Sequence, residues 1–116
     1  MSSPTPVAGP AFEGGDHTAT FSTDSDHVVV AIGEIDLASA PKLWEALSGL
    51  IERGSREVVL DMTAVEFLDS QGIRVIVRAH KQLEPLGGSL VVRAPQAQVR
   101  TVLEITGLSP LIQVED

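Results

Sequence analysis

The chain has 116 residues, of which 43% are hydrophobic and 21% are charged, and its formal net charge at pH 7 is −8. This length fits one domain with a single modest hydrophobic core. The absence of cysteine excludes disulfides, iron–sulfur clusters, thiolate zinc sites and cysteine nucleophiles. The negative charge argues against direct binding to nucleic acid or to anionic membranes, because both ligands require a surplus of cationic side chains.

The first 15 residues are rich in proline and glycine and contain few large apolar side chains. Such a segment cannot offset the entropy lost on ordering it, so we expect a flexible tail over residues 1–15 and one folded domain over residues 16–116. No run reaches the roughly 18 apolar residues of a membrane-spanning helix, and the N-terminus does not resemble a secretory signal. We therefore expect a cytoplasmic protein.

The first half of the domain predicts a β-hairpin followed by a helix. Thr18–Thr23 is rich in β-branched residues, His27–Ile32 is a nearly continuous apolar run, and turn residues separate them. Ser39 is the expected N-cap of the helix, Pro41 fits its first turn, and Gly54 ends it. Four apolar residues of this helix recur at helical spacing and are predicted to face the core, with Trp44 beside them: Leu43, Leu47, Leu50 and Ile51.

The second half alternates strands with helices. Apolar runs at Glu57–Leu60, Leu90–Val92 and Leu111–Val114 predict strands. One helix is expected from Asp69–Ser70 to Pro85, and another between Pro95 and Gly107. The order β-β-α-β-α-β-α-β predicts an α/β domain with a mixed, largely parallel sheet.

The helix that begins near Ser70 carries two stripes. The predicted core-facing stripe contains Ile73, Ile76, Val77, His80 and Leu83. The second stripe contains Arg74, Arg78 and Lys81, which fit either an ordinary solvated face or a contact surface for a partner. The histidines at positions 17, 27 and 80 lack the spacing of metal ligands, so no metal site is expected.

The segment Asp69–Gly72 lies where a predicted strand meets a predicted helix, and binding sites in parallel sheets form at such strand ends. A hydroxyl at Ser70 would lie near unpaired amides at the positive end of the helix dipole, an environment that accepts phosphate. The same serine also fits an ordinary N-cap. The carboxylates of Asp36 and Asp69 fit turns and caps as well as a binding site. No nucleophile or base converges with them, which argues against an enzyme and leaves no catalytic residue or cofactor expected.

Five segments resemble the STAS domain family, and within it the bacterial anti-sigma factor antagonists. They occur in the family's order and spacing, and the resemblance covers about residues 17–115: Gly33–Asp36, Val58–Asp61, Phe67–Gly72, Leu86–Val92 and Leu103–Leu108. The resemblance implies a mixed sheet with helices mainly on one face. It also implies that Ser70 is the residue phosphorylated in the family.

The resemblance further implies partner switching. The unphosphorylated form would bind an anti-sigma factor that is also a GHKL-type serine kinase, which then releases its sigma factor. Phosphorylation at Ser70 would end this binding, and a phosphatase would reverse it. The residues expected to bind the partner are Asp36, Asp69, Gln71, Gly72, Arg74, Arg78 and Lys81.

This chain departs from the family pattern just after Ser70. Members usually carry a second serine or threonine followed by Gly, Leu and Gly, whereas this chain has Gln71, Gly72, Ile73 and Arg74. Gln71 removes a second phosphorylation site, and Arg74 places a long cation on the face expected to meet the kinase. An alternative is therefore a structural or sensory STAS module, such as a signalling scaffold or a lipid-transport accessory subunit, without a phosphorylation switch. A nucleotide or small-molecule binder is a third alternative.

Overall fold

The computed structural model describes residues 19–116, so the predicted tail and the predicted start of the domain at Asp16 lie outside the described residues. Five strands form one sheet in the order β1-β2-β3-β4-β5. The first pair is antiparallel and every later pair is parallel, which confirms the predicted mixed, largely parallel sheet. The strands are β1 (Thr20–Ser25), β2 (Val28–Ile35), β3 (Glu57–Leu68), β4 (Ser89–Arg93) and β5 (Gln113–Glu115).

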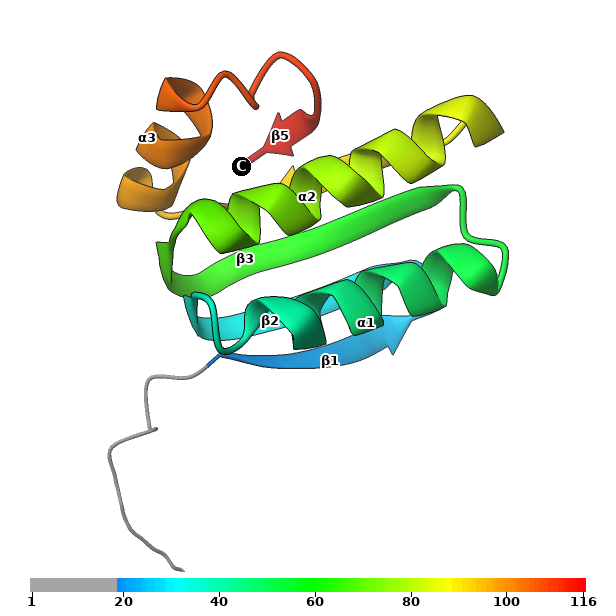
Figure 1. The fold of residues 1–116 in the computed structure, drawn as a ribbon, viewed down its shortest axis with the longest axis horizontal. Helices are drawn as coiled ribbons and strands as arrows, with labels where there is room; N and C mark the ends of the chain where they lie inside the picture. The colour runs from blue at the N-terminus through cyan, green and yellow to red at the C-terminus, as the bar shows by residue number, and fades with distance from the viewer. Residues whose placement is uncertain (1–18) are drawn as a thin grey trace, which may run out of the picture.

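The helices lie mainly on one face of the sheet, as expected. In Figure 1, α1 (Ala40–Glu52) and α2 (Ser70–Leu83) run side by side across this face, and α3 (Ala97–Ile105) lies at its end. A single 3-10 turn, η2 (Glu84–Leu86), extends α2 and ends at Gly87, whose φ of 76° is in the left-handed region that favours glycine.

The main hydrophobic core fills the space between the sheet and the three helices. It includes the four apolar residues of α1 that the helical spacing predicted. On the opposite face, Val28, Val59 and Val91 are neighbours in register across β2, β3 and β4, and they form a smaller cluster. The sheet therefore places its larger apolar face under the helices.

The buried face of α2 differs from the predicted stripe. Ile76 and Leu83 are buried and His80 is half-buried, as expected, but Ile73 and Val77 are only half-buried. The remaining buried positions are Gly72 and Ala79. Small residues on this face let α2 approach the sheet closely. The sequence analysis looked for the spacing of large apolar side chains and therefore did not predict these small buried positions.

Strand β3 is longer than predicted because its second half contains two irregularities. The predicted strand ended at Leu60, whereas β3 continues to Leu68. An extra residue of β3 is accommodated at each of two register shifts against β2, which breaks the alternation that marks a strand. Side-chain amides from Gln96 and Gln98 donate to the carbonyls of Thr63 and Glu66 in this irregular stretch, at 3.0 and 3.3 Å. These bonds attach the start of α3 to the second half of β3.

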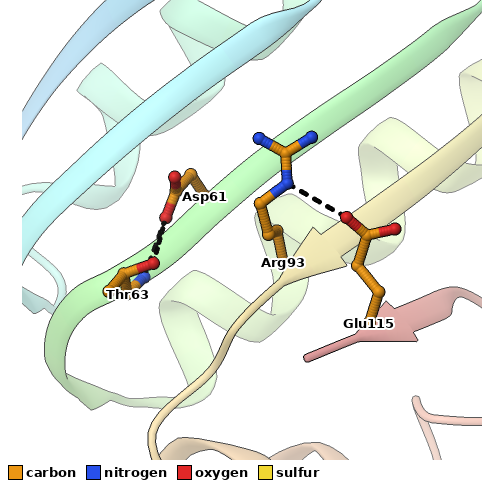
Figure 2. A network of polar contacts seen from close by, with 4 residues as sticks. All are labelled: Asp61, Thr63, Arg93 and Glu115. Atoms are coloured by element: carbon orange, nitrogen blue, oxygen red, sulfur yellow. Dashed lines mark hydrogen bonds and ion pairs between the residues drawn. The ribbon is translucent and has the colours of Figure 1, made fainter.

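Asp61 stabilises the first irregularity. Its carboxylate accepts hydrogen bonds from the Thr63 backbone N–H at 3.0 Å and from the Thr63 hydroxyl at 2.6 Å. On β4, Arg93 is in register with Asp61 and donates to Glu115 at 3.0 Å (Figure 2). Partial burial raises the pKa of Asp61, but the two Thr63 bonds and the Arg93 charge outweigh it and hold this pKa below its ordinary value of 3.8.

This depressed pKa predicts a pH-dependent contribution to stability. Since the folded-state pKa of Asp61 lies below the ordinary value of 3.8, the carboxylate stabilises the fold above that pH, and the contribution is lost as pH falls through the folded-state value. We expect Asp61→Asn to lower the free energy of unfolding by up to about 1 kcal/mol at neutral pH. Urea denaturation should show this difference shrinking below about pH 4, and a pH-independent difference would contradict the assignment.

Candidate functional site at the ends of strands β2 and β3

Two acidic turns lie side by side where β2 and β3 end. Ile35 and Leu68 are in register at the last residues of these strands, and Asp36 and Asp69 follow them directly. The Asp69 N–H donates to the Ile35 carbonyl at 3.1 Å, which extends the contact beyond the strands. The structure therefore brings Asp36 close to the start of α2.

Asp69, and not Ser70, is the N-cap of α2. Its backbone is extended, and its carboxylate accepts hydrogen bonds from the N–H groups of Gln71 at 2.8 Å and Gly72 at 3.3 Å. Ser70 is the first helical residue and is exposed. Its hydroxyl makes no hydrogen bond within residues 19–116. Because Asp69 already accepts hydrogen bonds from these amides, the interpretation of Ser70 as an ordinary N-cap is wrong.

The turn before α1 repeats this arrangement with different residues. The Asp36 carboxylate accepts hydrogen bonds from the N–H groups of Ala38 at 3.0 Å and Ser39 at 3.1 Å. Ser39 stands at the N-cap position but does not cap the helix with its side chain, which corrects the sequence expectation. Its completely buried hydroxyl accepts from the Asp36 N–H and donates to the Glu34 carbonyl. These bonds make the turn that borders the site rigid.

Gly72 allows α2 to begin directly above the two strand ends. A Cβ atom at this position would lie 2.4 Å from Leu68 Cδ1 and 2.7 Å from Ile35 Cγ2, both closer than real contacts allow. Leu68 and Ile35 are both buried, so they have little room to move aside. Gly72 is therefore required by close packing under the site, and it is not itself accessible.

A groove between α1 and α2 reaches Gln71, the residue after Ser70. It has a volume of about 610 Å³, and both Gln71 and Arg74 border it. Across the groove, the Arg78 guanidinium lies 3.9 Å from the centroid of the half-buried Trp44 ring, a cation–π contact between the two helices. The apolar lining comes from Leu37, Ala40, Pro41, Trp44 and Val75.

The basic stripe of α2 separates this groove from a second one. Arg74, Arg78 and Lys81 are all exposed, and they border a hollow of about 440 Å³ whose apolar side comes from Ile73 and Val77. The stripe was predicted from spacing, but its position between two hollows with apolar linings was not.

The sequence analysis did not place Leu37 or Trp44 in the α1–α2 groove. Leu37 is 71% exposed in the turn between Asp36 and Ser39, and Trp44 meets Arg78 only because the two helices lie side by side. A large apolar side chain in a short turn could have indicated that Leu37 is exposed at a binding surface. No signal in the sequence pairs Trp44 with Arg78.

Residues 19–116 contain neither a metal-ligand cluster nor a membrane-spanning helix. In this part of the chain, no group of three His, Asp or Glu side chains is placed to hold a metal ion. None of its helices has both the length and the apolar character needed to cross a bilayer.

The model of the STAS domain family matches residues 19–116, the whole described part of the chain. The chain belongs to the STAS domain family. The anti-sigma-B factor antagonist of Listeria monocytogenes is 35% identical over 94 residues, which cover 80% of this chain and 82% of that protein.

Solved structures share the fold. An anti-sigma factor antagonist from Mycobacterium paratuberculosis has a TM-score of 0.74 at 29% identity, with 86% of this chain and 87% of that chain covered. SpoIIAA, an anti-sigma factor antagonist, has a TM-score of 0.69 in its unphosphorylated form at 21% identity, covering 84% of this chain and 87% of that one. Its phosphorylated form has a TM-score of 0.62 at 21% identity, covering 84% and 90%.

The packing of Gly72 gives a direct test of how the site is built. We expect Gly72→Ala to lower the free energy of unfolding by about 1–3 kcal/mol, because the new methyl group overpacks the helix–sheet contact. Gly49→Ala in α1 is the matched control, since its nearest contact would be an ordinary 3.5 Å from an arginine side chain. The control should be neutral or gain up to about 1 kcal/mol from helix propensity. Equal stability of the two variants in chemical denaturation would exclude the close approach.

Proposed function

We propose that this protein is an anti-sigma factor antagonist. In its unphosphorylated form it binds an anti-sigma factor that is also a GHKL-type serine kinase, so that the sigma factor is released and transcription is regulated. Phosphorylation of Ser70 inactivates it, and a phosphatase restores it. The observation that carries the proposal is the exposed Ser70 hydroxyl, which has no hydrogen bond within residues 19–116, in a STAS domain whose relative is named an anti-sigma-B factor antagonist.

The geometry around Ser70 supports its role as the phosphorylated residue. Asp69 fixes the first turn of α2 through two hydrogen bonds, so the adjacent hydroxyl is presented on a rigid element. A kinase would transfer the γ-phosphoryl group of ATP to Ser70 Oγ, and its own base would take the hydroxyl proton. The carboxylates of Asp36 and Asp69 are engaged with backbone amides, which supports a binding role for this chain and not a catalytic one.

The surface beside Ser70 supports the binding of a protein partner. Gln71 and Arg74 line the α1–α2 groove, and Arg74, Arg78 and Lys81 continue along the exposed face of α2. Cations clustered on one face of a chain with net charge −8 fit a partner surface that carries carboxylates. Asp36 and Asp69 would border this interface, and Gly72 would support it from below.

Phosphorylation would act at the interface. A phosphate adds about −1.5 to −2 charge at neutral pH, beside the carboxylates of Asp36 and Asp69. A partner surface packed against a hydroxyl would meet both this charge and added bulk. A loss of about 2–4 kcal/mol weakens binding about thirtyfold to a thousandfold. Since the proposed partner controls a sigma factor, we place the protein in the cytoplasm.

The proposal predicts modification and loss of binding at one residue. Incubation with candidate anti-sigma kinases and ATP, followed by mass spectrometry, should find phosphate on Ser70. Ser70→Ala should keep its affinity for the same kinase, and Ser70→Glu should lose about thirtyfold or more in calorimetry, because a charge replaces the hydroxyl. Gln113→Glu adds the same charge on the edge strand β5 and should bind like the wild type. Equal binding of Ser70→Ala and Ser70→Glu to every candidate would refute the switch and favour a structural STAS module.

The groove predicts a binding defect without a folding defect. Leu37 is 71% exposed, so Leu37→Asp should leave the melting temperature nearly unchanged while it weakens the anti-sigma factor complex tenfold or more, about 1.4 kcal/mol. Leu86→Asp is the matched control, because Leu86 is 49% exposed in η2 at the other end of α2. Similar affinities for the two variants would place the partner elsewhere.

A further inference from the structure

Ser70 and Arg74 are placed to interact on the exposed side of α2. They are four residues apart, so they lie on one face of the helix with Cβ atoms about 5–6 Å apart. Both residues are exposed. Within the described part of the chain, neither the Ser70 hydroxyl nor the Arg74 guanidinium has a hydrogen bond or ion pair.

A phosphate at a helix N-terminus often binds backbone amides, but two of the amides at the start of α2 already have an acceptor. Asp69 already accepts hydrogen bonds from the N–H groups of Gln71 and Gly72. The carboxylates of Asp36 and Asp69 lie on the same rim and repel an anion. Within the fold, a side-chain cation is therefore the group suited to bind a phosphate on Ser70.

The other cations near this end of the fold are directed elsewhere. Arg78 lies about two helical turns from Ser70 along α2, and its guanidinium stacks over the Trp44 ring. Lys42 of α1 borders a separate hollow, which it shares with Phe21 and Thr23 of β1. Arg74 is the cation of residues 19–116 that lies one helical turn from Ser70.

We infer that a phosphate on Ser70 is bound by Arg74 of the same chain, an inference that rests on the proposed phosphorylation of Ser70. The guanidinium can donate two N–H bonds to one phosphate, which a helical i, i+4 spacing permits. One modification then makes two changes to the partner-facing surface. It adds negative charge, and it withdraws Arg74 from any carboxylate of the partner.

The test measures the phosphate directly. Phosphoserine is installed at position 70 of the full chain by genetic code expansion, and its second ionisation is followed by ³¹P NMR. The pKa of this ionisation is ordinarily about 6. We expect Arg74→Gln to raise it by about 0.5 relative to the chain with Arg74, because the dianion loses its nearby cation. Arg74→Lys should restore most of the difference.

Arg78→Gln is the matched control. Arg78 is eight residues from Ser70, about 12 Å along the helix axis, so its removal should leave the phosphate pKa unchanged within about 0.1. Thermal melting of each unphosphorylated variant confirms that the fold is retained. The same phosphate pKa with and without Arg74, or an equal change in Arg78→Gln, would overturn the inference.

The outcomes separate this inference from the proposed function. The phosphoserine is installed without a kinase, so a negative titration refutes only the Arg74 contact and leaves the proposed phosphorylation standing. Failure of every anti-sigma kinase to modify Ser70 would instead refute the proposed function.

Discussion

The parallel pairing of β2 with β3 holds the site together. It continues to the last residues of both strands, where Ile35 is in register with Leu68. The chain then turns sharply twice, at Asp36 and at Asp69, and each carboxylate accepts hydrogen bonds from the N–H groups two and three residues ahead. Two turns with the same pattern of carboxylate–amide hydrogen bonds therefore lie together at one edge of the sheet. A slip of this register would separate them and remove the rim on which Ser70 stands.

Close packing of α2 on these strands is the second requirement. Gly72 lies above Ile35 and Leu68, where any Cβ atom would collide. Because α2 packs this close to the sheet, the large half-buried side chains of Ile73 and Val77 lie at the edge of the core and not within it. Their exposed parts contribute to a hollow beside the basic stripe. The same packing that fixes the helix thus leaves apolar surface available to a partner.

Charge is distributed so that the rim and the helix face differ in sign. Asp36 and Asp69 lie at the rim, and Arg74, Arg78 and Lys81 lie along α2. A hydroxyl at the boundary is where a phosphate would change the local field most, because its charge adds to the carboxylates on one side and opposes the nearest cation on the other.

Local rules of the sequence were sufficient for the order of the elements, the parallel sheet and the exposed basic stripe, because apolar periodicity and turn residues report them directly. Tertiary structure decided the rest. The two irregularities of β3 break the alternation of apolar residues, so the sequence pattern did not predict its second half. Asp69 and not Ser70 is the N-cap of α2, because the Asp69 carboxylate accepts hydrogen bonds from the first amides of the helix. The groove that Trp44 and Arg78 line exists only because α1 and α2 lie side by side, and no local pattern encodes a contact between residues so far apart in the chain.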